Sequence, residues 1–195
     1  MSVLTRPSFR SLRSLTNRPY HGAHSTPLAA GCVDHAHTDR MLQHVCDPAA
    51  VIAEVARVLR PGGRFVAAEP DWDTLIISGD PDASHAFRRF VIEQAVRNAY
   101  VGRELPGLLT GTGFEVIDVL PVTAVFREVT AADQVLGLAR VTERASPAGY
   151  LAAGPGRAWL DRHAEGEFFA SMTLFIVVAA HPGHHDRRTA ATGTT

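Results

Sequence analysis

The chain has 195 residues and a formal net charge of −1, with 46% hydrophobic and 20% charged residues. This composition is typical of a globular protein of one domain and excludes a collagen-like or largely disordered chain. The net charge also argues against a general nucleic-acid binder, because a protein that neutralises phosphates needs an excess of basic residues, which this chain lacks. The longest apolar run, residues 168–180, is too short to cross a bilayer as a helix, so we predict no membrane partner.

Residues 1–31 differ in composition from the rest of the chain. They contain four arginines and no acidic residue, and no helical or strand period persists. We predict a disordered Arg- and Ser-rich arm there, with a transit peptide and a misread start or shifted frame as the alternatives. The folded domain is expected at residues 32–181, followed by a disordered tail at 182–195. Two cysteines are too few for a disulfide framework, which favours a reducing, cytoplasmic location.

The first predicted elements form a strand, a helix and a second strand. Residues 33–38 read as a short strand. Asp47 suits the N-cap and Pro48 the first position of a helix whose apolar residues share one face. Residues 61–63, Pro-Gly-Gly, stop that helix and turn the chain. Residues 64–69 then alternate little between apolar and polar, as expected for a strand that is covered on both faces.

The second half of the domain continues to alternate between helices and strands. We predict a helix at 80–99, a short helix at 105–109 ending at Gly111, and a strand at 114–119 that residues 122–128 extend or follow. Two further helices at 131–140 and 158–163 precede a final strand at 168–180. Strands and helices that alternate in this way predict an α/β layered fold.

Five segments together resemble class I S-adenosylmethionine-dependent methyltransferases, and the likeness is to their UbiE-like small-molecule branch. These segments are Asp39–His44, Asp47-Pro48, Arg57–Phe65, Ala68–Trp72 and Asn98–Arg103. The Arg-Val-Leu-Arg-Pro-Gly-Gly stretch is more specific than a lone glycine motif. The resemblance runs from Val33 to Ala180. It implies a partial Rossmann-like sheet, built from the family's late strands and helices, with an antiparallel last strand and helices covering it.

The chain departs from the family's pattern before the fourth strand of that sheet. The family places a Gly-rich cofactor turn after its first strand and an acidic residue at the end of its second, and neither motif occurs upstream of Asp47. On this reading residues 32–181 are a truncated methyltransferase domain. A sheet without its first half exposes a strand edge and an apolar patch, so we predict a homodimer through the exposed sheet edge.

The resemblance implies S-adenosylmethionine as cofactor, a small-molecule acceptor, and a set of residues around both. His44 is the candidate catalytic base, because an imidazole near neutral pKa can take the acceptor's proton; the alternative is a helix-start histidine with a solvent or capping role. Asp39, Arg40 and Gln43 are the candidate cofactor-binding residues, with ordinary polar surface as the alternative.

Six residues are implied to face the acceptor. They are Glu69, Asp71, Trp72, Asn98, Tyr100 and Arg103. The alternative for Trp72 is a packing residue. Arg103 is a candidate partner of an anionic substrate, with a surface ion pair to Glu104 or Asp118 as the alternative.

Two other interpretations remain beside methyl transfer to a small molecule. The first is a non-catalytic methyltransferase remnant or interaction module, because the cofactor half of the motif set is absent. The second is a zinc module in residues 22–46, which are rich in His and Cys. Their spacings match no standard zinc-ligand pattern, so we predict no metal site.

Overall fold

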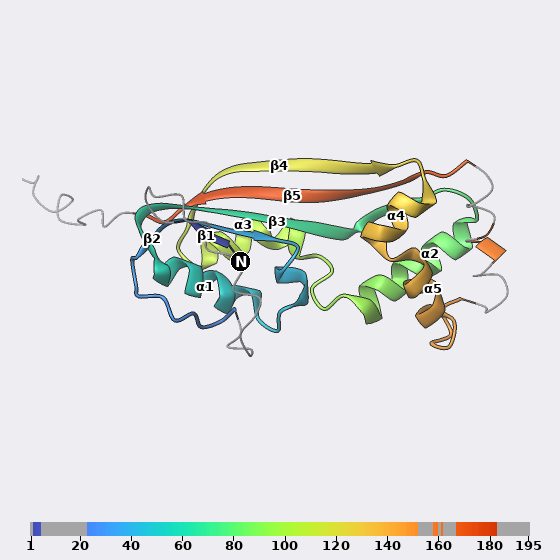
Figure 1. Cartoon of the computed structure of the whole chain (residues 1–195), viewed down its shortest axis with the longest axis horizontal. Coiled ribbons are helices and arrows are strands. Elements are labelled where there is room, and N and C mark those ends of the chain that lie inside the picture. Colours follow the sequence, from blue (N-terminus) through green and yellow to red (C-terminus); the bar gives the residue numbers. More distant parts are fainter. Residues whose placement is uncertain (1, 5–22, 152–157, 160, 162–166, 183–195) are drawn as a thin grey trace, which may run out of the picture.

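A computed structural model describes residues 2–4, 23–151, 158–159, 161 and 167–182, which form one five-stranded sheet with helices packed on it (Figure 1). The strands are β1 (Ser2–Leu4), β2 (Val33–Asp39), β3 (Leu59–Ile77), β4 (Glu115–Phe126) and β5 (Ala170–Ala180). The helices are α1 (Pro48–Val58), α2 (Pro81–Phe90), α3 (Val101–Gly111), α4 (Val129–Leu136) and α5 (Leu138–Ala145), with single turns η1 (Leu42–His44) and η2 (Val91–Ala95).

The strand order is β1-β2-β3-β5-β4. β2 and β3 are parallel, whereas β5, the last strand in the chain, lies antiparallel between β3 and β4. The predicted partial Rossmann-like sheet with an antiparallel last strand is therefore confirmed. β1 was not predicted; it pairs antiparallel with β2 and occupies the edge of β2 at residues 35–37.

Local sequence signals explain where α1 begins. The Asp47 carboxylate accepts a hydrogen bond from the backbone N–H of Ala50 at 3.0 Å, and Pro48 occupies the first helical turn, as predicted. The helix buries Val51 and Val55 against the sheet. The helix ends at Val58, earlier than predicted, and β3 follows directly.

Several elements differ from their predicted bounds. The helix predicted at 80–99 ends as α2 at Phe90 and continues only as the single turn η2. The helix predicted at 131–140 is interrupted by Gly137, whose φ of 66° a glycine adopts without strain, so that α4 and α5 are separate helices. The short helix predicted at 105–109 is the longer α3, and the helix predicted at 158–163 lies mostly outside the described residues. Of the two alternatives for the strand that begins at residue 114, the structure has the extended one, the continuous β4.

Part of the predicted disordered arm has a defined place against α1. Thr26 donates from its backbone N–H and its hydroxyl to Glu54, at 2.6 and 2.7 Å. Arg57 donates to Glu54 and to the carbonyl of Leu28. Residues 23–31 therefore pack on the helix, which differs from the prediction of disorder. Residues 5–22 and the tail from 183 lie outside the described part of the chain.

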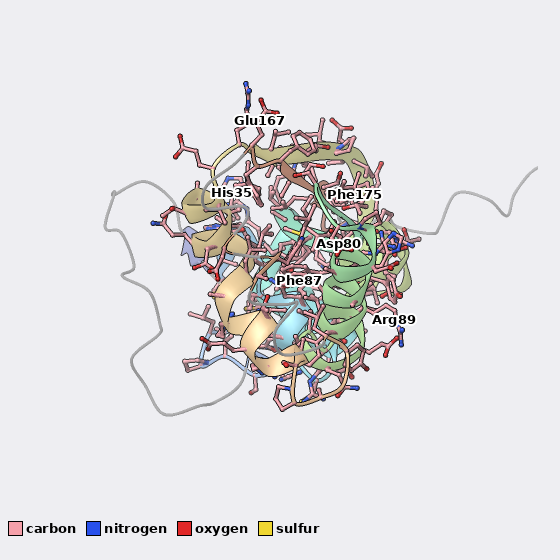
Figure 2. All side chains as sticks on the ribbon, turned by 90° about the vertical axis from the view of Figure 1, so that its right-hand side faces the viewer. His35, Asp80, Phe87, Arg89, Glu167 and Phe175 are labelled. Carbon is pink, nitrogen blue, oxygen red and sulfur yellow. The ribbon has the colours of Figure 1, made fainter. Side chains whose placement is uncertain are left out.

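Two hydrophobic clusters lie at the two ends of the sheet, on opposite faces of β5. One contains Val177 and Ala179 of β5 and packs under α1 and α3; the other contains Ala170 and Met172 and packs under α2, α4 and α5. Side chains alternate along a regular strand, so these odd and even residues point to opposite faces. Figure 2 shows Phe87 of α2 turned into the second cluster, whereas Arg89 points away.

Each end of the sheet thus has one face without a helix from the described residues. Apolar side chains are exposed on both faces of the edge strand β4. The large hydrophobic residues exposed on β4 are Ile117, Val119, Leu120, Val122 and Val125. Both cysteines are free and exposed. Within the described residues, the helices are too short or too polar to cross a membrane.

Candidate functional site

The turn after β2 is fastened to β3 by a buried carboxylate, Glu69. This side chain is 0% exposed, and it accepts hydrogen bonds from the backbone N–H groups of Met41 (2.9 Å), Leu42 (2.7 Å) and Gln43 (3.3 Å). Burial raises the pKa of Glu69, although these three donors act in the opposite direction. The carboxylate of Glu69 thereby holds the single turn η1 beside the carboxyl end of β2.

The side chain of Gln43 connects this turn to the segment after Glu69. Its amide oxygen accepts from the indole N–H of Trp72 at 2.8 Å, and its amide nitrogen donates to the carbonyl of Arg40 at 3.1 Å. Asn98 closes the turn from the other side by donating to the carbonyls of Leu42 and Val45, both at 2.8 Å. The loop is therefore held by side chains from three separate segments.

An ion pair lies beside this network. The guanidinium of Arg103 donates to both carboxylate oxygens of Asp71, which is 1% exposed, and to Asp73 at 3.2 Å. It also lies over the ring of Tyr100, 5.2 Å from its centroid. The hydrogen bond to Asp71 raises the pKa of Arg103, so the guanidinium stays charged. Glu104 and Asp118, its alternative partners from the sequence, are not the residues that pair with it.

The approach of α3 to the end of β3 depends on Gly102. A Cβ atom at this position would lie 2.8 Å from the backbone of Glu69 and Pro70. A side chain is excluded at that distance, so the glycine allows α3 to start directly against the strand. Arg103 follows and reaches Asp71 for this reason.

Three predicted residues lie at the exposed rim of the network. The carboxylate of Asp39 pairs with the guanidinium of Arg40, with N–O distances of 3.1 and 3.3 Å. Arg40 has a φ of 49°, in the left-handed region that non-glycine residues adopt rarely. The exposed side chain of His44 forms no hydrogen bond with the described residues.

The structure thus brings the ten predicted site residues to one region, where β2 ends beside the middle of β3 and α3 starts. Asp73, which lies close to Asp71 in the sequence, is a second partner of Arg103. The sequence analysis did not single out Thr38, which has a buried hydroxyl without a hydrogen-bond partner in the described part of the chain. A polar residue at an inward position of β2 was the available signal for Thr38. Within the same part of the chain, His, Cys, Asp and Glu form no group of three or more suited to a metal ion.

Comparison with known proteins finds a family model that matches part of the chain. The family model described as Methyltransferase domain matches residues 13–67, a segment that contains β2, the turn after it, α1 and the first part of β3. This segment is similar to part of a methyltransferase domain. The crystal structure of a protein of Bacillus halodurans, named as a candidate methyltransferase, shares this fold with a TM-score of 0.56 at 14% identity. That comparison covers 83% of this chain and 69% of the other.

Another solved structure and two sequence relatives are similar to this chain. The YcgJ protein of Bacillus subtilis superimposes with a TM-score of 0.51 at 13% identity, over 82% of this chain and 68% of that one. An uncharacterized 37.1 kDa protein in transposon Tn4556 of Streptomyces fradiae is 55% identical over 157 residues, 80% of this chain and 46% of that protein. An O-methyltransferase of Pyrenophora dematioidea is 32% identical over 124 residues, 63% of this chain and 44% of that protein. The chain therefore spans a little under half the length of these two relatives.

Proposed function

We propose that this chain takes part in methyl transfer from S-adenosylmethionine to a small-molecule acceptor. The observation that supports this most strongly is the methyltransferase match over residues 13–67, because it includes the turn that Glu69 fastens to the sheet. Ligands of open α/β sheets bind outside the carboxyl ends of the strands, and the network lies at that edge.

Two polar side chains at this edge, Asp39 and Arg40, are available to bind the cofactor. The exposed side chains of Asp39 and Arg40 pair with each other, and neither has another side-chain partner among the described residues, so both retain bonding capacity toward a ligand. The amide of Gln43, by contrast, is engaged on both sides by Trp72 and Arg40. Asp39 and Arg40 would hold the cofactor, and Gln43 would position the turn that carries them.

The bound cofactor supplies a methyl group that is already activated on a sulfonium, so the protein's contribution is positioning and proton removal. The imidazole of His44, exposed beside Asp39 and Arg40 in this turn, would take the proton from the acceptor atom as that atom's electron pair forms the new bond to carbon. Trp72 and Tyr100 would border the acceptor. Arg103, whose guanidinium is taken up by Asp71 and Asp73, would orient this wall rather than bind an anionic substrate.

Calorimetric titration with S-adenosylhomocysteine tests the binding half of this proposal. We expect micromolar binding by the wild-type chain and about tenfold weaker binding by Asp39→Ala, the loss of one charged hydrogen-bond acceptor. Asp82→Ala removes an exposed carboxylate of α2, at the other end of the sheet, and should bind like wild type. His44→Ala should also bind normally but lose methyl transfer in an acceptor screen. A folded wild-type chain that does not bind would contradict the proposal.

One observation favours a second candidate, a non-catalytic methyltransferase module. The polar groups of the network satisfy one another, as Glu69 does with residues 41–43 and Arg103 with Asp71, so the site keeps its shape without a ligand. In that case the titration shows no heat, and the variants at Asp39 and His44 are indistinguishable from wild type.

A further inference from the structure

A single residue, Asn98, holds the backbone on both sides of His44. Its side-chain amide nitrogen donates to the carbonyls of Leu42 and Val45, each at 2.8 Å. Its backbone N–H donates to the carbonyl of Gln43 at 3.0 Å. Three neighbouring carbonyls therefore bond to one residue that lies more than fifty positions later in the chain. We call these three hydrogen bonds the Asn98 clasp.

The partners fix which way the Asn98 amide points. A primary amide nitrogen carries two protons, and the two carbonyl oxygens take both of them. Turning the amide over would place its oxygen against those carbonyl oxygens, where no hydrogen bond can form. An aspartate has the same shape but only accepts hydrogen bonds when ionised, so it could not replace the asparagine. The clasp therefore depends on an amide at this position.

The clasp holds the backbone of His44 without touching its imidazole. The N–H of His44 donates to the carbonyl of Met41 at 3.0 Å, inside the single turn η1. The side chain is exposed and forms no hydrogen bond with the described residues. A single turn has little stability of its own, so its place depends on the residues that bind it from outside. The ring nitrogens of His44 thus stay available to a ligand while its backbone is held.

Glu69 and Asn98 hold different parts of this turn. Glu69 accepts hydrogen bonds from the N–H groups of residues 41–43, all of which precede His44. The Asn98 clasp also reaches Val45, the residue after His44. Without Asn98 the chain would be released at Val45 while Glu69 kept the turn on the sheet. The direction of the imidazole would then no longer be fixed.

Asn98 is itself carried by a well-anchored part of the fold. Its carbonyl accepts from the N–H of Val101 at 3.2 Å, where α3 begins. The next residue, Ala99, accepts from the N–H of Trp72 at 3.0 Å. α3 lies directly against β3 because Gly102 has no side chain. A residue supported in this way can hold a functional side chain in one geometry.

We propose that Asn98 is a positioning residue, which aims the imidazole of His44 at the proton that it removes. This role rests on the proposed methyl transfer. In that step the electron pair of the acceptor oxygen forms the bond to the methyl carbon, the carbon–sulfur bond breaks to leave S-adenosylhomocysteine, and the proton passes to His44. A base must lie within hydrogen-bond reach of its proton, and a misplacement of about 1 Å can slow a reaction about a hundredfold.

Hydrogen exchange of the full chain, followed by NMR, tests the clasp without a ligand. Asn98→Ala should speed exchange of the His44 amide proton about tenfold or more, because the turn is released on one side. Thr112→Val is the matched control. The Thr112 hydroxyl donates to the carbonyls of Leu108 and Leu109 at 2.8 and 3.0 Å, at the other end of α3, and valine has its shape without the donor. This variant should leave the exchange of His44 within about twofold of wild type.

The wild-type chain provides a measurement that needs no variant. It contains two asparagines, Asn17 and Asn98, so two pairs of side-chain amide protons appear after asparagine labelling. The pair of Asn98 should exchange slowly, since both protons are hydrogen-bonded. Asn98→Asp keeps the shape without the donors and should behave like Asn98→Ala. Circular dichroism checks that each variant folds.

Methyl transfer to two phenols tests the role in proton removal. Phenol must lose a proton to react, whereas 4-nitrophenol is largely ionised slightly above neutral pH and needs no base. Asn98→Ala should lower kcat for phenol by about ten- to a hundredfold, but for 4-nitrophenol by less than about threefold. KM and S-adenosylhomocysteine binding should stay within about twofold of wild type. Thr112→Val should leave kcat unchanged for both acceptors.

Three results would overturn the role of Asn98 alone. They are equal exchange of His44 in Asn98→Ala and Thr112→Val, a fast-exchanging Asn98 amide in wild type, and an equal loss of kcat for both phenols. A raised KM with an unchanged kcat would also overturn it, because Asn98 would then contact the acceptor itself. A wild-type chain that methylates neither phenol would contradict the proposed catalysis by His44, and the role of Asn98 with it.

Discussion

Replacing Glu69 by alanine should destabilise the protein strongly, because one side chain serves three backbone donors. The donors on Leu42 and Gln43 belong to buried residues, and that on Met41 is half-buried. A lost hydrogen bond costs about 1 kcal/mol, and a donor left buried without a partner costs about 1–3 kcal/mol. Releasing a carboxylate from burial returns part of this cost. We therefore expect Glu69→Ala to lower the free energy of unfolding by about 3 kcal/mol, a large share of the typical total of about 5–15 kcal/mol.

Glu69→Gln provides a graded comparison. Its amide oxygen still accepts from Met41 and Leu42, but its amide nitrogen faces the N–H of Gln43, so we expect a loss of about 1 kcal/mol. The carboxyl pKa is raised in the folded state. Its protonation therefore contributes stability that is fully present below pH 4.5 and lost as the pH rises through the raised pKa. The glutamine variant lacks this contribution, so its deficit against wild type should shrink across that range.

Urea unfolding followed by circular dichroism measures these differences from the midpoint and slope. Glu143→Ala, an exposed position on α5, is the control and should change the free energy of unfolding by less than about 0.5 kcal/mol. The reasoning fails if Glu69→Ala unfolds within that margin of wild type, or if the glutamine variant is the less stable of the two.

Three further outcomes follow from the same contacts. The hydrogen bonds from Arg57 lower the pKa of Glu54 from 4.5 to about 2. The stability from this shift is present above pH 4.5 and is lost as the pH falls through about 2. Thermal melts of Glu54→Gln should therefore depend less on pH than those of wild type, by up to about 3 kcal/mol. Arg103→Ala leaves the buried carboxylate of Asp71 unpaired and should lower the free energy of unfolding by about 3 kcal/mol. The double variant Asp71→Asn, Arg103→Gln leaves no buried charge and should lower the free energy of unfolding by less. Equal losses in urea titrations would argue against a buried-charge effect. Gly102→Ala should destabilise the protein by about 1–3 kcal/mol, because its Cβ would lie 2.8 Å from backbone atoms. Gly107→Ala, in the same helix with open space around it, should stabilise the protein by about 0.5–1 kcal/mol. Melting temperatures that shift in the same direction in both variants would refute the argument.

The elements that were predicted correctly depend on local chemistry. Asp47 and Pro48 define the start of α1 because a cap and a fixed φ act within one turn. The second half of β3 was not predicted, because it forms through pairing with β5, almost a hundred residues later in the chain. The family resemblance predicted which residues lie together around the end of β2. It did not predict the partner of Arg103, which depends on the close approach of α3 to β3 that Gly102 allows. That contact has no local sequence signal. The roles of the site residues in binding and catalysis stay predictions.

β3 and β5 have a further consequence for how the protein moves. Both strands pass without interruption of the chain from the cluster under α1 and α3 to the cluster under α2, α4 and α5. The β3–β5 register shifts between Asp71 and Ile76, but β4 stays paired with β5 through this region. A rotation of one end against the other would have to break that β4–β5 pairing, so we expect the two ends to move together and to unfold in one cooperative step. If the site binds an acceptor as proposed, we expect that molecule to enter without a hinge motion between the two ends of the sheet.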